Sequence, residues 1–180
     1  MAGPDRPLDG ALAALHREFG IPADYAAARG WPVQPEADVT ALVSIGEDVF
    51  GREQRLIRPA ADAWRGLCAA AAAAGVVLQP VSAFRDVAYQ VEVIRRKIAA
   101  GRSMENILQV NALPGYSEHH TGRAVDITTP GVEPLNETFE TTDAFDWLTL
   151  HARQFQFRLS YPRGNRLGIA YEPWHWAYVP

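Results

Sequence analysis

The amino-acid sequence predicts an α+β fold in which helices flank a small antiparallel sheet. Segments with apolar residues at helical spacing come first and short strand-like segments follow, without the regular strand–helix–strand alternation that is typical of a parallel sheet. The length of 180 residues fits one domain with a short additional segment. A hydrophobic content of 48% and a charged content of 21% are typical of a globular chain.

The N-terminal forty residues predict two helices and carry no recognisable functional motif. Apolar residues recur every three or four positions over residues 7–19, which predicts a helix there. A second, short helix is expected over residues 22–29, ended by Gly30 and Pro32. We therefore expect an N-terminal helical segment, residues 1–40, followed by the functional domain, residues 41–180.

Four further helices are predicted after residue 40, and most have recognisable end signals. Pro59 stands in the first turn of the longest helix and Gly75 follows its end. Asp86 can cap the next helix, and Gly101 ends it. The expected ranges are 58–74, 87–100, 103–110 and 143–155, the last with Thr142 or Asp143 as its cap.

Short segments that are rich in β-branched and aromatic residues predict the strands. The expected ranges are 41–45, 76–84, 124–128, 157–160 and 174–179. A turn is expected at Gly46, an irregular stretch over 111–122 and a loop over 130–141. Because the strands are short and joined without helical crossovers of regular length, we expect them to pair in antiparallel fashion.

Charge, cysteine content and hydropathy exclude several classes of protein. The formal net charge of -4 argues against nucleic acid as a partner. The single cysteine, Cys68, excludes an intramolecular disulfide and any metal site built from several thiolates. The longest apolar stretch, residues 69–78, is much shorter than the roughly 20 residues that cross a bilayer, so we expect no membrane span.

The N-terminal sequence also gives an expectation about location. It lacks the basic region and the apolar core of a secretory signal. We therefore expect a cytoplasmic protein, or a periplasmic or cell-surface one if a leader has been removed. We further expect a monomer.

Two short segments bring together residues that can bind a metal and activate water. In the first, His119 precedes Asp126 by seven residues, and Gly122 permits a turn between them. In the second, Glu172 and His175 stand three residues apart among aromatic residues. Two histidines and one aspartate form a three-ligand zinc site with an open position for water, and a nearby glutamate can take a proton from that water. Either spacing alone also occurs by chance in proteins without a metal.

Several motifs in the same order resemble the zinc-dependent D-alanyl-D-alanine carboxypeptidases, which include the vancomycin-resistance D,D-carboxypeptidases, the D,D-dipeptidases and the related L,D-carboxypeptidases. The resemblance covers roughly residues 41–179 and implies the fold shared by these enzymes and hedgehog-type signalling domains. The matching segments are Ser82 to Arg85 with Tyr89 and Gln90, Ser117 to Asp126, Ser160 to Asn165 and Tyr171 to Trp176. Two departures are Ala83-Phe84, where the family commonly has Gly-Tyr, and Ala177, where it often has a polar residue.

The resemblance implies a role for each matching site residue. His119, Asp126 and His175 are expected to bind one Zn²⁺ ion, with Glu172 as the general base. Arg85 is expected to polarise the scissile carbonyl and stabilise its oxyanion. Ser117 and Gln90 are expected to hold the terminal carboxylate or the backbone of the substrate. Trp174 is expected to line the substrate cleft.

His120 needs a separate interpretation, because it adjoins His119. Its offset of six residues from Asp126 does not match the family spacing. A neighbour on an extended segment also points to the opposite side. We therefore expect His120 to support the site or to pack nearby rather than to bind the metal, and Trp176 to belong to the core.

The implied reaction is hydrolysis of the C-terminal D-Ala-D-Ala bond of peptidoglycan stem peptides or muropeptides. One alternative is an L,D-carboxypeptidase that acts on tetrapeptide muropeptides, and a D,D-dipeptidase is a weaker one. Another alternative is a non-catalytic zinc domain that binds peptidoglycan peptides or a protein partner. The presence of both Glu172 and Arg85 favours catalysis, since a binding domain needs neither.

Overall fold

The computed structural model describes residues 10–180, and these residues form two antiparallel sheets surrounded by helices. The larger sheet has four strands in the order β3-β4-β6-β5, and a separate hairpin pairs β1 with β2. The strands are β1 Leu42–Glu47, β2 Glu53–Ile57, β3 Gln79–Ser82, β4 Ala124–Thr128, β5 Phe157–Leu159 and β6 His175–Tyr178. The expected α+β class is confirmed.

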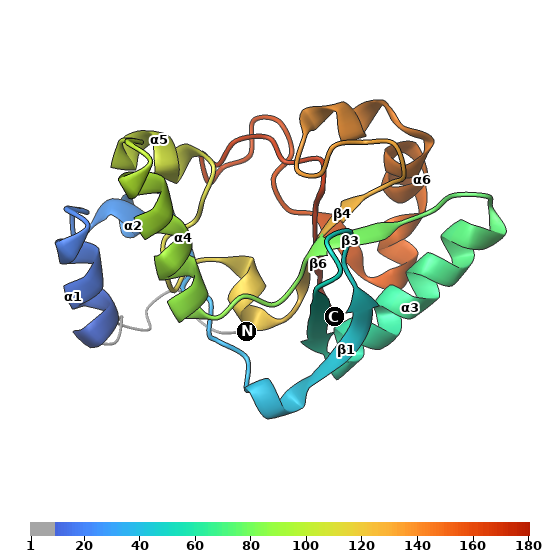
Figure 1. Ribbon diagram of the computed structural model, residues 1–180, viewed down its shortest axis with the longest axis horizontal. Coiled ribbons are helices and arrows are strands. Elements are labelled where there is room, and N and C mark those ends of the chain that lie inside the picture. Colours follow the sequence, from blue (N-terminus) through green and yellow to red (C-terminus); the bar gives the residue numbers. More distant parts are fainter. Residues whose placement is uncertain (1–9) are drawn as a thin grey trace.

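The helices lie in two groups on either side of the larger sheet. Figure 1 shows α3 and α6 together on one side, and α1, α2, α4 and α5 on the other. The α-helices are α1 Gly10–Glu18, α2 Tyr25–Ala28, α3 Arg58–Ala73, α4 Val87–Ala99, α5 Met104–Gln109 and α6 Asp143–His151. Short 3-10 helices are η1 Val39–Ala41, η2 Glu118–Thr121, η3 Glu137–Thr141 and η4 Ala152–Phe155.

Alternation along the two central strands gives the larger sheet one apolar face and one polar face. On β4 and β6 the apolar side chains that face α3 and α6 are Val125, Ile127, Trp176 and Tyr178, all buried in the main core. The intervening residues, Asp126 and His175, point to the other face. The sheet therefore separates the hydrophobic core from the face that carries the candidate site.

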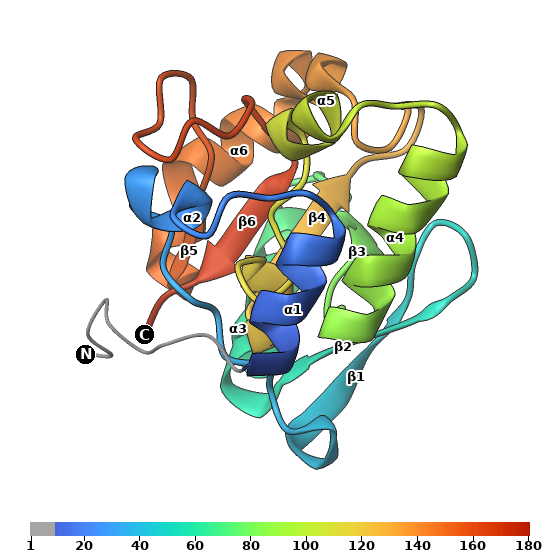
Figure 2. The same cartoon turned by 90° about the vertical axis from the view of Figure 1, so that its left-hand side faces the viewer.

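The N-terminal segment packs against the polar side of the sheet through a second apolar cluster. This cluster joins residues of the first forty, Ile21, Ala26 and Trp31, to Tyr161 and Ile169 of the C-terminal half. Figure 2 shows α1 alongside α4, where Glu18 and Arg95 form an ion pair of 3.2 Å. His16 of α1 also hydrogen-bonds the carbonyl of Pro114 at 2.9 Å, just before η2.

Several helix ends agree with the sequence signals. The Asp86 carboxylate accepts a hydrogen bond from the backbone N–H of Tyr89 at 2.6 Å, and Thr142 rather than Asp143 caps α6. Gly75 has φ +78°, as expected at the end of α3. The first three residues of the helix expected over 7–19 lie outside the described residues, and the rest forms α1. None of the described helices is both long and apolar enough to cross a bilayer.

Three expected elements need correction. The strand expected over 76–84 is shorter and covers only Gln79–Ser82, because the N–H of Val76 bonds the carbonyl of Ala71 at the end of α3 and residues 76–78 are irregular. The loop expected over 130–141 contains η3, and the helix expected over 143–155 changes to 3-10 geometry at Ala152. Strand β2 was not expected at all, because it begins with three polar residues.

Candidate active site

Sheet register places Asp126 opposite His175. The two residues are direct partners in the antiparallel β4–β6 pair, and Asp126 also pairs with Ser82 of β3. The His175 Nδ1 lies 3.1 Å from Oδ1 of Asp126. Both side chains are buried, although residues 126 and 175 lie 49 positions apart in the chain. Pairing within the sheet thus brings the two sequence motifs to one point.

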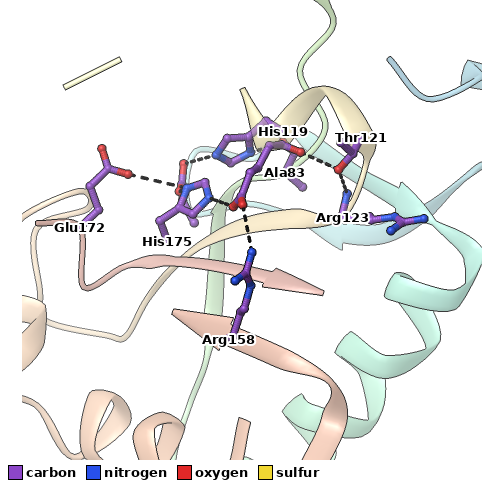
Figure 3. Close-up of polar contacts among 9 residues, drawn as sticks. Ala83, His119, Thr121, Arg123, Arg158, Glu172 and His175 are labelled. Carbon is purple, nitrogen blue, oxygen red and sulfur yellow. Dashed lines mark hydrogen bonds and ion pairs between the residues drawn. The ribbon is translucent and has the colours of Figure 1, made fainter. Parts of the chain in front are cut away.

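The short helix η2 brings His119 to the same point. Its Nε2 lies 3.3 Å from Oδ2 of Asp126, and its Nδ1 lies 2.5 Å from the carbonyl oxygen of Ala83 (Figure 3). A carbonyl only accepts, so Nδ1–H is the donor and the lone pair stays on Nε2. Gly122 ends η2 with φ +64°, the left-handed turn that directs the chain into β4.

The three side chains fit a single metal ion. His119, Asp126 and His175 each offer a ligand atom, and these atoms lie within 4.8 Å of one another. The Nε2 of His119 is buried and has no hydrogen-bond partner within residues 10–180, and a metal ion would supply one. Two imidazoles and one carboxylate are the donor set of catalytic zinc sites. We call these three residues the His–Asp–His triad.

Electrostatics in this buried region favour a cation. The neighbouring imidazoles outweigh the effect of burial and hold the pKa of Asp126 well below its ordinary value. Burial lowers the pKa of His119 to about 4, which keeps its ring neutral and able to bind a metal. Glu118 and Glu172 add two more carboxyl groups around the triad. Three carboxyl groups therefore lie around the two imidazoles, with the positive charge of Arg85 nearby.

Glu172 lies beside the triad and outside it. Its Oε2 is 3.7 Å from Nδ1 of His175, too far for a hydrogen bond, and it approaches that ring as a separate group (Figure 3). The backbone N–H of Glu172 bonds the carbonyl of Tyr161 at 3.1 Å, which fixes the start of the turn into β6. Burial raises the pKa of Glu172 to about 7, the value that suits a general base near neutral pH.

Arg85 extends from the segment that follows β3. Its backbone N–H bonds the carbonyl of His119 at 3.3 Å, so the arginine is tied to η2. Its Nε is buried and has no hydrogen-bond partner. The positive charge of Arg85 contributes to lowering the pKa of His119, after burial, and opposes the rise in the pKa of Glu172. The guanidinium therefore lies near enough to both His119 and Glu172 to interact with them electrostatically.

Among residues 10–180, none of the three predicted substrate-binding residues forms a hydrogen bond to the triad. Gln90, on α4, is buried and donates from Nε2 to the carbonyl of Ala112 at 2.8 Å, while its Oε1 has no partner. Ser117 is buried immediately before η2 and does not cap that helix. Trp174 is half-buried against the main core, and Trp176 is fully part of it.

His120 packs beside the site and does not face the triad, as expected, but the expectation of an extended segment was wrong. The segment is a 3-10 helix rather than an extended strand, and successive side chains point about 120° apart. His120 therefore leaves the triad and donates from Nδ1 to the carbonyl of Arg85 at 2.6 Å, while its Nε2 accepts from the N–H of Gly115 at 3.2 Å. Fully buried, it ties the arginine segment to the loop before η2.

Two residues near the triad were missed from the sequence. The Oε2 of Glu118 lies 3.0 Å from Nε2 of His175, and its side chain also faces Arg158. The ring of Tyr161 packs on His175 with centroids 4.6 Å apart. The sequence feature that could have pointed to Glu118 is its position next to His119. For Tyr161 it is the matching segment from Ser160 to Asn165.

Comparison with known proteins agrees with this geometry. The family model VanY: D-alanyl-D-alanine carboxypeptidase matches residues 53–180. YodJ of Bacillus subtilis (strain 168) is 30% identical over an alignment of 173 residues, which covers 93% of this chain and 59% of YodJ. The chain thus spans less than two thirds of the length of that relative.

Solved structures share the fold. The LdcB LD-carboxypeptidase has a TM-score of 0.70 and 32% identity, covering 79% of this chain and 70% of the LdcB chain. A mutant of the vancomycin-resistance D,D-pentapeptidase VanY, solved in complex with Zn(II), has a TM-score of 0.62 and 25% identity, covering 82% of this chain and 86% of that chain. With the family match extending over residues 53–180, this chain belongs to the VanY family of D-alanyl-D-alanine carboxypeptidases.

Proposed function

We propose that this protein hydrolyses the C-terminal D-Ala-D-Ala bond of peptidoglycan stem peptides as a zinc-dependent D,D-carboxypeptidase. The observation that carries the proposal is the buried His–Asp–His triad with Glu172 beside it, at 3.7 Å from His175 and outside the ligand set. Family membership supports the reaction class, since the matching model is that of D-alanyl-D-alanine carboxypeptidases.

One zinc ion would be held by Nε2 of His119, a carboxylate oxygen of Asp126 and Nδ1 of His175. A bound zinc supplies Lewis acidity that makes water more acidic and a carbonyl more electrophilic. The related VanY structure contains Zn(II), which supports zinc as the metal here. The carbonyl of Ala83 fixes the His119 ring in the required tautomer, because it takes the Nδ1–H.

The protein side chains account for the proton transfers and for the developing charge. Glu172 takes a proton from water while the water oxygen bonds to the carbonyl carbon. The Arg85 guanidinium stabilises the resulting oxyanion, and loss of one such donor typically costs about 10²–10³ in rate. The C–N bond then breaks, and Glu172 gives its proton to the amine of the departing D-alanine.

Neighbouring side chains are assigned to substrate placement. Ser117 adjoins η2, and Gln90 has an unpaired, buried Oε1. We assign both to the terminal carboxylate or backbone of the substrate, with Trp174 as a wall of the cleft. The Nε2 of Gln90 already donates one of its two N–H groups to the carbonyl of Ala112.

The second candidate is an L,D-carboxypeptidase acting on tetrapeptide muropeptides. It is supported by the similarity to LdcB, an LD-carboxypeptidase whose structure concerns peptidoglycan recognition, at 32% identity. The metal and base residues serve both reactions. A non-catalytic zinc domain is disfavoured by the Glu172 and Arg85 side chains beside the triad, because binding alone needs neither a base nor an oxyanion partner.

One experiment tests these candidates together. Zinc-loaded protein is incubated with pentapeptide and tetrapeptide muropeptides, and the products are identified by mass spectrometry. Loss of one D-alanine from the pentapeptide alone is the expected result. Loss of D-alanine from the tetrapeptide instead would establish the L,D activity, and no cleavage of either peptide would overturn the enzymatic proposal in favour of binding.

A further inference from the structure

The side chain of Glu118 lies between His175 of the triad and Arg158. It stands one residue before His119 in η2, and its side chain is only 15% exposed. One carboxylate oxygen, Oε2, lies 3.0 Å from Nε2 of His175, and the other, Oε1, lies 3.6 Å from Nη2 of Arg158 on β5. Figure 3 shows Arg158 and Glu172 on different sides of the His175 ring.

Each ring nitrogen of His175 faces a different carboxylate. Nδ1 is directed to Asp126 at 3.1 Å and has Glu172 nearby at 3.7 Å, so it points to the common centre of the triad. Nε2 is directed away from that centre, to Glu118. The nitrogen that points to the centre must carry a lone pair to bind a metal, which requires the proton to be on Nε2.

We propose that Glu118 is a positioning residue that selects this tautomer and orientation of His175. Its carboxylate accepts the Nε2–H, which leaves the Nδ1 lone pair directed to the metal and fixes the plane of the ring. Carboxylates that hold metal-binding histidines in this way commonly alter metal affinity or activity by about 10–100-fold when removed. The inference rests on the proposed zinc site and adds a fourth side chain to its construction.

The fold gives Glu118 two features that suit this role. Because Glu118 and His119 are consecutive in one 3-10 turn, the same short segment supplies one ligand and orients the other. Arg158 approaches the outer oxygen from the edge strand of the sheet, where its own side chain is 62% exposed. This exposed cation offsets part of the charge of Glu118 without entering the site.

The aromatic packing around His175 does not determine which ring nitrogen faces the centre of the triad. Tyr161 contacts one face of the ring at 4.6 Å between centroids, and His119 lies edge-on at 4.8 Å. These contacts restrict the position of the ring but do not distinguish its two nitrogens. Asp126 faces Nδ1 at 3.1 Å, but it is itself a ligand of the proposed metal, so Glu118 is the carboxylate that remains to accept a proton from the ring. Loss of Glu118 should therefore weaken metal binding rather than folding.

The test compares Glu118→Gln and Glu118→Ala with a matched control, Glu53→Gln, which removes a carboxylate from an exposed ion pair on β2. Zinc affinity is measured by competition with a chelator, and ¹⁵N NMR of the zinc-loaded protein reports which nitrogen of His175 is protonated. We expect E118A to bind zinc about 100-fold more weakly and E118Q about 10-fold, since a neutral amide oxygen is the weaker acceptor. E53Q should bind zinc as the unmodified protein does.

The outcomes separate this inference from the proposed function. Failure of the unmodified protein to bind zinc would overturn both. If the unmodified protein binds zinc, and E118Q binds it with the same affinity and with the same His175 tautomer, the role of Glu118 alone would be overturned. If E118A does not fold, as judged by circular dichroism without zinc, E118Q decides the question, because it retains the shape of the side chain.

Discussion

Asp126 and His175 face each other as paired residues of β4 and β6, with Nδ1 of the histidine 3.1 Å from Oδ1 of the aspartate. Their neighbours in the same strands, Val125 and Trp176, pair on the opposite, apolar face. A slip of one residue would turn the site residues into the core. The burial of Trp176 and Val125 thus determines the register, and the register determines the metal site.

Substitution of the ligands should abolish zinc binding. We expect His119→Ala and His175→Ala to lose stoichiometric zinc, because each leaves two protein ligands in place of three. His120→Ala is the control, since its ring bonds Arg85 and Gly115 instead of facing the triad. Elemental analysis of the purified variants measures the zinc content. Zinc loss in the His120 variant with full zinc in the His119 variant would contradict the assignment.

Glu172→Gln should remove turnover while leaving the metal in place. The amide cannot take a proton from water, and general-base catalysis typically contributes about 10²–10⁴-fold to the rate. The zinc content should stay normal, because Glu172 lies outside the ligand set. Cleavage of a muropeptide substrate, followed by mass spectrometry and paired with zinc analysis, checks both expectations. Near-normal turnover in this variant would remove Glu172 from the base role.

Gly122→Ala should destabilise the fold more than a comparable change elsewhere. Gly122 has φ +64°, and an added Cβ would lie 2.9 Å from Leu42 Cδ2 and 3.1 Å from Ile57 Cγ2. We expect a loss of about 1–3 kcal/mol, which combines backbone strain with this crowding. Gly164→Ala is the control, since it has φ +70° and open space around it. Urea unfolding measures the stability of both variants. Equal losses of unfolding free energy in the two would mean that backbone strain alone is responsible.

Asp48 should make the fold sensitive to acid. Burial raises the pKa of this carboxyl, but hydrogen bonds from the backbone of Arg52 and Phe50 and from the Arg52 guanidinium outweigh it, so the pKa lies below its ordinary value. Its stabilisation is therefore complete above the unfolded-state pKa, near ~3.9, and is lost as the pH falls through the lower native value. Gln54 also donates to Asp48 at 2.7 Å.

Urea unfolding of the unmodified protein and Asp48→Asn across acid and neutral pH measures this effect. The NH₂ group of asparagine cannot accept the hydrogen bonds that Arg52 and Gln54 donate to the Asp48 carboxylate. We therefore expect the free energy of unfolding to fall by about 1–3 kcal/mol near neutral pH. The difference between the two proteins should shrink in acid, where the aspartate also loses its charge. A difference that stays constant with pH would show that the charge of Asp48 is not the cause.

Local patterns in the sequence predicted the main helices, and short motifs together with the family resemblance predicted the ligand set. End signals such as Asp86, Thr142 and Gly75 act within a few residues, and the structure places them as the patterns indicate. His119, Asp126 and His175 were predicted because each metal-binding motif is short and continuous. Their convergence within 4.8 Å agrees with that prediction.

Strand β2 shows why other elements could not be predicted. One of its two buried residues, Gln54, is polar, so the strand lacks the apolar alternation that identifies strands in a sequence. Gln54 is accommodated because its amide joins Asp48 to the backbone N–H of Ala83, at 2.7 Å for each bond. These partners lie 6 and 29 positions away in the chain, beyond any local pattern.

The sequence by itself determined the α+β class and the main helices, because these depend on periodicity and end signals. The His–Asp–His triad and the glutamate beside it followed from short motifs that resemble those of a known family. Only the tertiary structure decided that Glu118 faces the second nitrogen of His175, that His120 holds the Arg85 segment, and that the N-terminal segment packs on the loops around the site. Each of these contacts joins residues at least 35 positions apart, or apolar residues from both ends of the chain. The physical reason is that such contacts form only when folding brings distant segments together, and no local pattern records them.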